Sequence, residues 1–309
     1  MRILVTGSSG MIGTALLQAL HKEGHEVLGI DITPPTEESA ATFAQHDLRT
    51  PVSDDVNKKL DGKTIDLIIH LAANARVYQL VLEPDRALDN IAMTHHIFEF
   101  ARKNKIPRFL LASSRETYGN GNELPVHESV ASQRNTESSY SVSKISGEAY
   151  CYAYSHCYNI DARIMRYSNV YGRFDMSDRF IPKVILNLMQ NKPVTIYGEG
   201  KTLDFTYLDD AVSGTATLVR KWDELPPEER EYNIAFGEQA TLLEVAQKLS
   251  DILGSTSTID VGENLTGEVM NYQADISRMK KHGWAPVTPL DEGLGHAIKY
   301  YRKAYNIPE

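Results

Sequence analysis

The chain has 309 residues, enough for one large α/β unit or two modest domains. Its formal net charge of −9 argues against a nucleic-acid-binding surface, because such surfaces are basic, although a few local cations could still hold an anionic substrate. No apolar run reaches the length of a membrane span or signal peptide, so we expect a cytoplasmic protein. Cys151 and Cys157 are the only cysteines, and we expect both to be free thiols.

Short apolar runs alternate with longer amphipathic segments over residues 1–170. Near-continuous apolar runs are typical of strands that are covered on both faces, as in parallel sheets. The alternation predicts right-handed crossovers and a Rossmann-type, doubly wound parallel α/β sheet. The predicted strands are 3–5, 26–30, 66–70, 108–112 and 162–167, and the predicted helices are 11–22, 84–103 and 137–158.

The pattern changes after residue 170. We expect residues 171–309 to form a smaller mixed α/β lobe that binds the substrate. Some strand–helix segments of this range are candidates to pack on the first domain instead. The polar stretch 119–139 is too long for a loop without a function in a compact domain, so we expect it to border the site. The expected elements of the lobe are helices 180–191, 208–222, 242–253 and 290–303, strands 194–197 and 204–207, a turn at 198–200 and a surface loop at 226–230.

Three glycines lie between the first predicted strand and the first predicted helix. They permit a tight turn, a close approach of backbone N–H groups to a pyrophosphate, and packing of the helix on its strand. The positive end of the helix then faces the phosphate charge. The spacing differs by one residue from G-x-G-x-x-G, and an isolated glycine trio is more often a structural turn. The strand–turn–helix context favours a dinucleotide site made by Gly7, Gly10, Met11, Ile12 and Gly13.

Two acidic positions follow predicted strands in the same half of the chain. Asp31 ends the second strand, where a carboxylate can accept hydrogen bonds from both ribose hydroxyls and repel a 2′-phosphate, which favours NAD over NADP. The alternative is a solvated loop acid before Pro34 and Pro35. Asp47 and Leu48 end a further apparent strand and are weaker candidates for contact with the adenine.

Tyr140 and Lys144 share one face of a predicted helix, because residues four apart are neighbours there. Tyrosine has an ordinary pKa of about 10, and a neighbouring ammonium favours its phenolate. The lysine could also bind the nicotinamide ribose. Tyr140 could instead be a packed aromatic, since Tyr150, Tyr152 and Tyr154 follow closely. Beside the glycine motif, we favour acid/base catalysis.

A serine pair follows the strand predicted at 108–112. Ligands of open parallel sheets bind beyond the carboxyl ends of the strands. We therefore expect Ser114 to hold a substrate oxygen while Tyr140 moves its proton, with a helix-cap or turn serine as the alternative.

Together these residues resemble extended short-chain dehydrogenase/reductases of the NAD-dependent epimerase/dehydratase group, typified by UDP-galactose 4-epimerases. The set is specific for the family but not for the reaction. The resemblance runs nearly end to end and covers residues 6–13, Asp31, 47–48, 70–73, Asn90, 112–114, Tyr140 with Lys144, 166–172, 204–210, 267–269 and 274–277.

The resemblance implies roles for further residues. The strand end with Leu71, Ala72 and Ala73, together with Asn90, would support the NAD pocket. Ser114 and Tyr140 would be the catalytic pair with Lys144 assisting, and Asn169 would hold the diphosphate of a nucleotide sugar, taken to be UDP-linked. Members of the family are usually dimers joined through two helices, here 84–103 and 137–158. The resemblance implies no metal.

Two departures concern the diphosphate. Members often carry arginines just before the stretches at 204–207 and 267–269, but this chain has Leu203 and Leu265 in those neighbourhoods. Arg173 is our candidate replacement, with Arg179 and Lys201 as others. A cation on a polar stretch is, however, more often solvated.

A 4-epimerase needs the fewest groups, because hydride leaves C4 and returns while one residue takes and restores the hydroxyl proton. A 4,6-dehydratase or UDP-glucuronate decarboxylase needs an extra acid or base, and Glu116 matches its position. Arg115 stands where glucose-type dehydratases place the acid, and Glu116 could simply pair with Arg115. A non-enzymatic NAD-binding protein tends to lose the tyrosine and lysine present here. We therefore predict a UDP-hexose 4-epimerase, with the dehydratase or decarboxylase as alternative.

Overall fold

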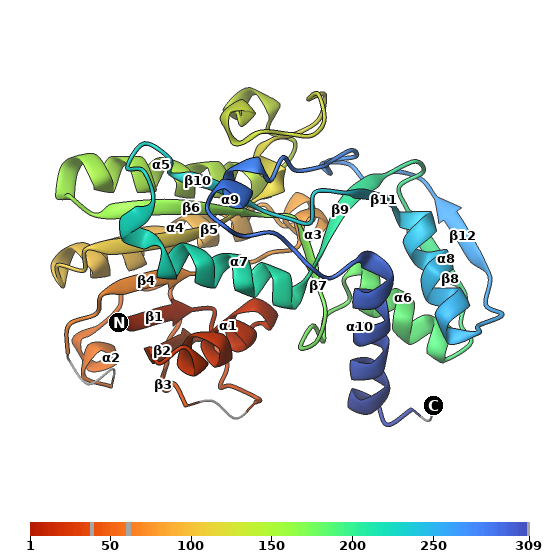
Figure 1. Ribbon diagram of the computed structural model, residues 1–309, viewed down its shortest axis with the longest axis horizontal. Helices are drawn as coiled ribbons and strands as arrows, with labels where there is room; N and C mark the ends of the chain where they lie inside the picture. The colour runs from red at the N-terminus through yellow and green to blue at the C-terminus, as the bar shows by residue number, and fades with distance from the viewer. Residues whose placement is uncertain (38–39, 60–62, 308–309) are drawn as a thin grey trace.

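The computed structural model describes residues 1–37, 40–59 and 63–307 and shows a large sheet covered by helices beside a smaller lobe (Figure 1). The large sheet has seven strands in the order β10-β6-β5-β4-β1-β2-β3, all paired in parallel. This confirms the predicted doubly wound α/β fold. Its strands are β1 (Arg2–Thr6), β2 (Glu26–Asp31), β3 (Thr42–Gln45), β4 (Leu67–His70), β5 (Arg108–Ser114), β6 (Asp161–Tyr167) and β10 (Glu231–Ile234).

The strands of the large sheet are buried on both faces. Ile3 and Val5 pack into one hydrophobic cluster and Leu4 into another, and all three are fully buried. The first cluster is covered by α1 (Met11–Lys22) and α7 (Leu208–Arg220), the second by α4 (Asp85–Lys103) and α5 (Ser139–Tyr158) (Figure 1). Alternate side chains of a strand point to opposite faces, so continuous apolar runs suit this two-sided burial.

The longer predicted elements are confirmed, with small shifts at their ends. Helix α5 begins at Ser139 because the Ser138 side chain caps it by accepting from the Ser141 N–H. Helix α7 ends at Arg220, and Trp222 lies in a separate 3₁₀ turn. Short elements without a periodic pattern were not predicted. They are α2 (Asp54–Lys59), α3 (Val77–Leu82), α9 (Ser277–Lys281), β7 (Asn169–Tyr171), β10, β11 (Gln239–Thr241) and β12 (Ile259–Gly262).

The smaller lobe contains two small sheets, β11-β9-β7 and β12-β8. Its hydrophobic cluster is separate from the two that cover the large sheet. Strand β10 and helix α7 follow this lobe's first elements but pack on the large sheet, so the chain passes between the two parts more than once. The remaining elements are β8 (Val194–Tyr197), β9 (Thr202–Tyr207), α6 (Phe180–Met189), α8 (Leu242–Leu253) and α10 (Leu290–Ala304).

Asp204 ties the segments of this lobe together. Its fully buried carboxylate accepts backbone N–H bonds from Phe236 at 3.0 Å, Gly237 at 2.8 Å and Ala274 at 3.3 Å. Burial raises the pKa of Asp204 to about 6, against the opposing effect of these three donors. One acidic side chain thus satisfies backbone donors from two distant segments.

Replacing Asp204 by Asn should therefore destabilise the protein. The new amide group would turn N–H donors toward backbone N–H groups, leaving buried donors unpaired at a cost of about 1–3 kcal/mol. Urea unfolding followed by circular dichroism measures the loss. Asp260→Asn, on the exposed side of β12, is the matched control. Equal unfolding free energies for the two variants would contradict the account.

No helix within the described ranges is both long and apolar enough to cross a membrane.

Candidate active site

The carboxyl ends of β1, β4 and β5 meet at one edge of the sheet. In register, Thr6 pairs with His70, and His70 pairs with Leu111. The hydroxyl oxygen of Thr6 and Nδ1 of His70 are 2.7 Å apart, and the Ala72 N–H donates to the same hydroxyl at 3.3 Å. The glycine loop, the segment after β4 and the serines that end β5 are therefore brought together, as expected for an open parallel sheet.

The glycine loop has almost no room for side chains. Gly7 has a φ of +68°, and a Cβ added there would lie 2.7 Å from the Ala72 nitrogen. A Cβ added at Gly13 would lie 2.1 Å from the Gly7 carbonyl oxygen. Gly10 is the N-cap of α1, has no side-chain capping bond, and no acid follows in the first turn. The helix N-terminus therefore keeps its free N–H groups for an anion.

The apolar residues of the same region have mainly structural contacts. Met11 is buried in the core, while Ile12 and Leu71 are half-buried and pack against the same cluster. Ala72 packs against the cluster on the opposite face of the sheet, and Ala73 lines a cavity in front of the glycine loop.

Asp31 lies beside the glycine loop at the end of β2. Its carboxylate accepts the Ser9 N–H at 3.0 Å and both the N–H and hydroxyl of Thr33 at 3.1 Å. The acid therefore couples the glycine loop to the segment after β2. A ribose-binding role stays a prediction.

Asp47 and Leu48 differ in which of their atoms already have partners. The Asp47 carboxylate pairs with Arg49, 2.6 Å from Nη2, and this hydrogen bond lowers the Asp47 pKa. The Leu48 side chain is buried in the core, while its carbonyl accepts from Nδ1 of His96 at 2.8 Å. The buried Leu48 side chain packs the sheet, so adenine contact from these residues stays a prediction.

Asn90 is buried behind the segment that follows β4. Its side-chain oxygen accepts the Asn74 N–H at 2.7 Å, and its amide group donates to the Asn74 carbonyl and the Ser143 hydroxyl, each at 3.1 Å. Asn90 therefore supports the cavity wall by holding Asn74 and α5.

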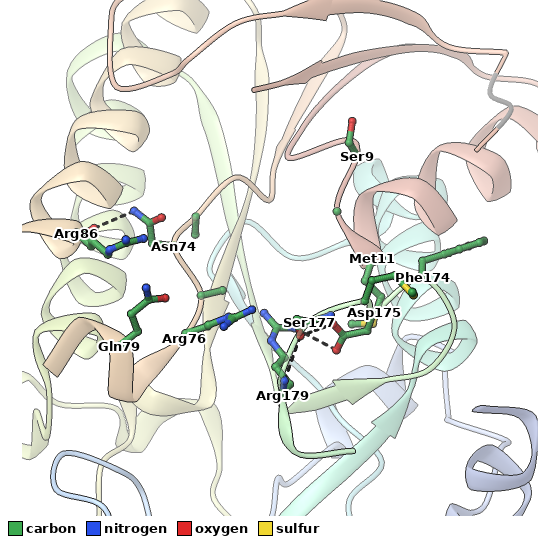
Figure 2. Close-up of a pocket in the computed structure, with 14 residues that line it drawn as sticks. Ser9, Met11, Asn74, Arg76, Gln79, Arg86, Phe174, Asp175, Ser177 and Arg179 are labelled. Carbon is green, nitrogen blue, oxygen red and sulfur yellow. Dashed lines mark hydrogen bonds and ion pairs between the residues drawn. The ribbon is translucent and has the colours of Figure 1, made fainter. Parts of the chain in front are cut away.

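A cavity of about 590 Å³ opens in front of the glycine loop. Figure 2 shows Ser9 and Met11 on one side and the arginines opposite. Arg76 forms an ion pair with Asp178, which joins the start of α3 to the segment before α6. Sequence reasoning missed Arg76 and Arg86, because an arginine on a polar stretch carries no distinguishing pattern. The lining residues are Ser9, Gly10, Met11, 73–76, Gln79, Arg86, 174–177 and Arg179.

The predicted catalytic residues come together at the end of β5. Tyr140 is 6% exposed and close enough to Ser114 for that hydroxyl to favour its phenolate, and the Lys144 ammonium lies 5.6 Å from the centre of the tyrosine ring. Lys144 Nζ donates to the Ala112 carbonyl at 2.8 Å. Phenol, hydroxyl and ammonium are thus clustered in a nearly dry site.

Burial sets the ionisation of this cluster. It raises the pKa of Tyr140 to about 12, although the Ser114 hydrogen bond opposes the rise, and it lowers the pKa of Lys144 to about 8. The expected lowering of the tyrosine pKa by Lys144 is not found. Desolvation of the phenolate is the larger effect, and the ammonium is turned toward the Ala112 carbonyl.

Glu116 is buried beside Arg115. Arg115 Nη2 lies 2.8 Å from Oε1 of Glu116, and Arg115 Nε donates to the side-chain oxygen of Asn169 at 2.9 Å. Burial raises the pKa of Glu116 despite the opposing charges of Arg115 and Lys201. Glu116 therefore does pair with Arg115, and its raised pKa also suits an acid/base.

The candidate diphosphate cations have acidic partners. Arg173 forms an ion pair with Asp209, and the buried Lys201 lies 2.5 Å from Glu268. Leu203 is buried in the core of the smaller lobe. Arg115 was not predicted as a diphosphate cation, but it donates to Asn169, the residue predicted to hold the diphosphate.

Comparison with known proteins shows the family of the chain. The model of the NAD dependent epimerase/dehydratase family matches residues 3–235. The chain belongs to this family. A relative named uncharacterized UDP-glucose epimerase from Bacillus subtilis is 33% identical over 99% of both chains. UDP-glucuronic acid decarboxylase 1 of Danio rerio is 30% identical over 98% of this chain and 73% of that protein.

Solved structures of the same kind superpose closely. UDP-glucuronic acid 4-epimerase from Bacillus cereus, in complex with UDP-glucuronic acid and NAD, has a TM-score of 0.88 and 31% identity, covering 99% of this chain and 100% of that one. UDP-glucose 4-epimerase of Thermus thermophilus, in complex with NAD, has a TM-score of 0.89 and 25% identity, covering 98% and 100%. These two epimerases are named for different UDP-linked sugars.

Within the described residues, no group of three or more His, Cys, Asp or Glu side chains is arranged to hold a metal ion.

Proposed function

We propose that this enzyme is an NAD-dependent 4-epimerase of a UDP-linked hexose. The observation that carries the proposal is the clustering of Ser114, Tyr140 and Lys144 at the end of β5, beside the glycine loop and its cavity. Relatives named UDP-glucose epimerase and structures named UDP-glucose and UDP-glucuronic acid 4-epimerase support it.

The residues present fit NAD. The close approach at Gly7 and Gly13 leaves backbone N–H groups and a helix N-terminus for the pyrophosphate. Asp31 lies where it would bind the adenosine ribose and repel a 2′-phosphate. Arg76 and Arg179 line the opposite wall of the cavity as further cations. When bound, NAD supplies a hydride acceptor that returns the hydride in the same cycle.

The protein's own residues move the proton. Ser114 and Tyr140 would contact the C4 hydroxyl of the sugar, and Tyr140 would take its proton and later return it. Lys144 would contribute positive charge and a hydrogen bond to the nicotinamide ribose. The site's near-complete burial excludes water from the transient ketone.

The diphosphate would lie near Asn169 and Arg115, which are hydrogen-bonded to each other. Arg173 remains a candidate that would first have to leave Asp209. We also propose that the smaller lobe, which is formed from within residues 171–309, completes the sugar pocket. We propose further that two copies of the chain pair through α4 and α5, and that the protein works in the cytoplasm.

One observation favours a second function. Glu116 is 2% exposed with a raised pKa, and it lies close enough to Tyr140 to raise the pKa of that phenol. Such an acid suits a 4,6-dehydratase or UDP-glucuronate decarboxylase, and a decarboxylase is among the 30%-identical relatives. The paired Arg115 argues for the epimerase, because it occupies the position of the dehydratase acid.

Product analysis separates these functions. The protein is incubated in turn with UDP-glucose, UDP-N-acetylglucosamine and UDP-glucuronate, and the products are identified by NMR. An epimerase gives a mixture of C4 epimers with no loss of mass. A 4-keto-6-deoxy product or release of CO₂ would rule out the epimerase.

Tyr140→Phe should lose turnover by about 10²–10⁴-fold, because the proton acceptor is removed while the ring remains packed. Turnover is measured by NMR and NAD affinity by fluorescence titration. Tyr150→Phe, a tyrosine further along α5 that is not in the site, is the matched control. Unchanged turnover in the Tyr140 variant would favour a non-enzymatic protein.

Gly13→Ala should weaken NAD binding by roughly 100-fold. The added Cβ would displace the loop and cost about two charge-assisted hydrogen bonds, or about 3 kcal/mol. Calorimetric titration with NAD gives the Kd. Gly295→Ala on α10, where a Cβ has open space, controls for general effects. A Gly13 variant with native affinity would place the cofactor elsewhere.

Turnover should fall above a pH of about 8. Lys144 is charged below its pKa of about 8 and loses its proton as the pH rises, while Tyr140 titrates much higher. If the charged form is required, kcat drops about tenfold per pH unit on that limb. A kcat–pH profile at saturating substrate measures it. A flat profile to pH 10, with circular dichroism showing intact fold, would contradict the requirement.

A further inference from the structure

A buried ion pair lies directly behind the candidate catalytic residues. The Glu148 carboxylate accepts two hydrogen bonds from Arg166, from Nε at 2.9 Å and from Nη2 at 2.7 Å. It accepts a third from the Ser113 hydroxyl at 2.5 Å. Glu148 is 8% exposed and Arg166 is 3% exposed. A bidentate pair with a third donor satisfies the buried carboxylate with charge-assisted hydrogen bonds.

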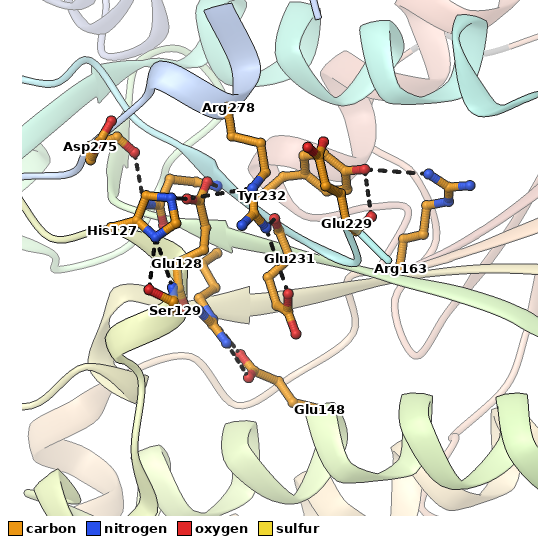
Figure 3. A network of polar contacts seen from close by, with 12 residues as sticks. His127, Glu128, Ser129, Glu148, Arg163, Glu229, Glu231, Tyr232, Asp275 and Arg278 are labelled. Atoms are coloured by element: carbon orange, nitrogen blue, oxygen red, sulfur yellow. Dashed lines mark hydrogen bonds and ion pairs between the residues drawn. The ribbon is translucent and has the colours of Figure 1, made fainter. Parts of the chain in front are cut away.

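This pair connects three elements of the site. Glu148 comes from α5, Arg166 from β6 and Ser113 from the end of β5. Arg166 Nη1 donates in addition to the Glu128 carbonyl at 2.7 Å and the Tyr118 hydroxyl at 3.2 Å. Glu148 and Glu128 therefore belong to one polar network (Figure 3). The network fixes α5 against the strand end that carries Ser114.

Glu148 is also the acid nearest in sequence to Lys144, one turn along the same helix. Its charge favours the Lys144 ammonium, whereas burial disfavours it. The other titratable groups that face Lys144 are Tyr140 on α5 and His70 on β4. Burial, and then the Lys144 charge, lower the pKa of His70 to about 3, so it is neutral at physiological pH.

We propose that Glu148, held by Arg166 and Ser113, is a positioning residue that keeps Lys144 charged and fixes the end of β5 at Ser114. The catalytic meaning of this role rests on the proposed function above. Glu148 does not touch the reacting atoms, because its carboxylate is occupied by Arg166 and Ser113. A buried ammonium without a counter-charge would give up its proton. Glu148 is that counter-charge.

The test variant is Glu148→Gln, which keeps the side-chain shape and removes the charge. The Lys144 titration midpoint should fall by roughly one pH unit. The midpoint is read from the ¹³Cε NMR signal of lysine-labelled protein, assigned by its absence in Lys144→Met. The alkaline limb of the kcat–pH profile should move by the same amount, which a merely structural role would not produce.

Glu99→Gln is a closely matched control. Glu99 on α4 also accepts two bonds from one arginine, Arg102, both at 2.8 Å. It too accepts a hydroxyl from another element, Tyr154 on α5, at 2.8 Å. Glu99 is partly exposed and is no part of the Ser113–Glu148–Arg166 group. Its variant should leave the Lys144 midpoint and the kcat–pH profile unchanged.

A second variant guards against misfolding of Glu148→Gln. Replacing a buried ion pair by apolar side chains of similar volume often preserves stability. The double variant Glu148→Leu with Arg166→Met is therefore expected to fold. It should show the same lowered Lys144 midpoint. A wild-type midpoint in either folded variant would overturn the proposal. The NMR titration needs no substrate, so a lowered midpoint in a protein without epimerase activity would refute the proposed function alone.

Discussion

The close approach of α5 to β5 is the constraint on which the site depends. Gly147 allows it, because a Cβ there would already lie 3.2 Å from the Leu111 side chain. Three residues earlier on the helix, Lys144 reaches the Ala112 carbonyl at the strand's end. Tyr140 and Ser114 then meet without any flexible segment between them. Packing of one helix on one strand thus assembles the candidate acid/base.

The same packing decides the electrostatics. Removing the cluster from water raises the pKa of Tyr140 and lowers that of Lys144, so the dry site favours the neutral form of both groups. Charges nearby are arranged in pairs: Glu148 with Arg166, Glu116 with Arg115, and Glu268 with Lys201. Each pair sets an acidic side chain against a basic one inside the protein. The positive charge of an oxidised nicotinamide entering this site would favour the phenolate, because opposite charges stabilise each other most in a dry environment.

Relatives named as an epimerase and as a decarboxylase both match nearly the whole of this chain, so the fold cannot distinguish these reactions. In the proposed function, the difference lies in Arg115 and Glu116, which follow Ser114 directly. The ion pair with Arg115 hinders Glu116 from simple proton transfer. Burial favours the neutral form of Glu116, which suits it to act as an acid in a dehydratase or decarboxylase. In this proposal, the type of reaction depends on the Arg115–Glu116 ion pair and not on the fold.

The order of strands and helices in the first half of the chain could be predicted, because apolar runs and helical periodicity are local signals. The glycine loop and the Tyr140–Lys144 spacing could be predicted for the same reason. Short elements such as β10 and α3 could not, since their few residues show no pattern that distinguishes them from the surrounding segments. Neither could the cavity arginines Arg76 and Arg86, or the diphosphate candidate Arg115, which only contacts with distant residues distinguish from solvated cations.

The sequence alone determined the fold class, the family and the identity of the candidate acid/base, because each depends on spacing within a few residues. Only the tertiary structure decided the charge states and partners: that burial outweighs Lys144 at Tyr140, that Arg173 is held by Asp209, and that Glu148 stands behind Lys144. Desolvation and ion pairing depend on what surrounds a side chain, and those surroundings come from segments far apart in the chain.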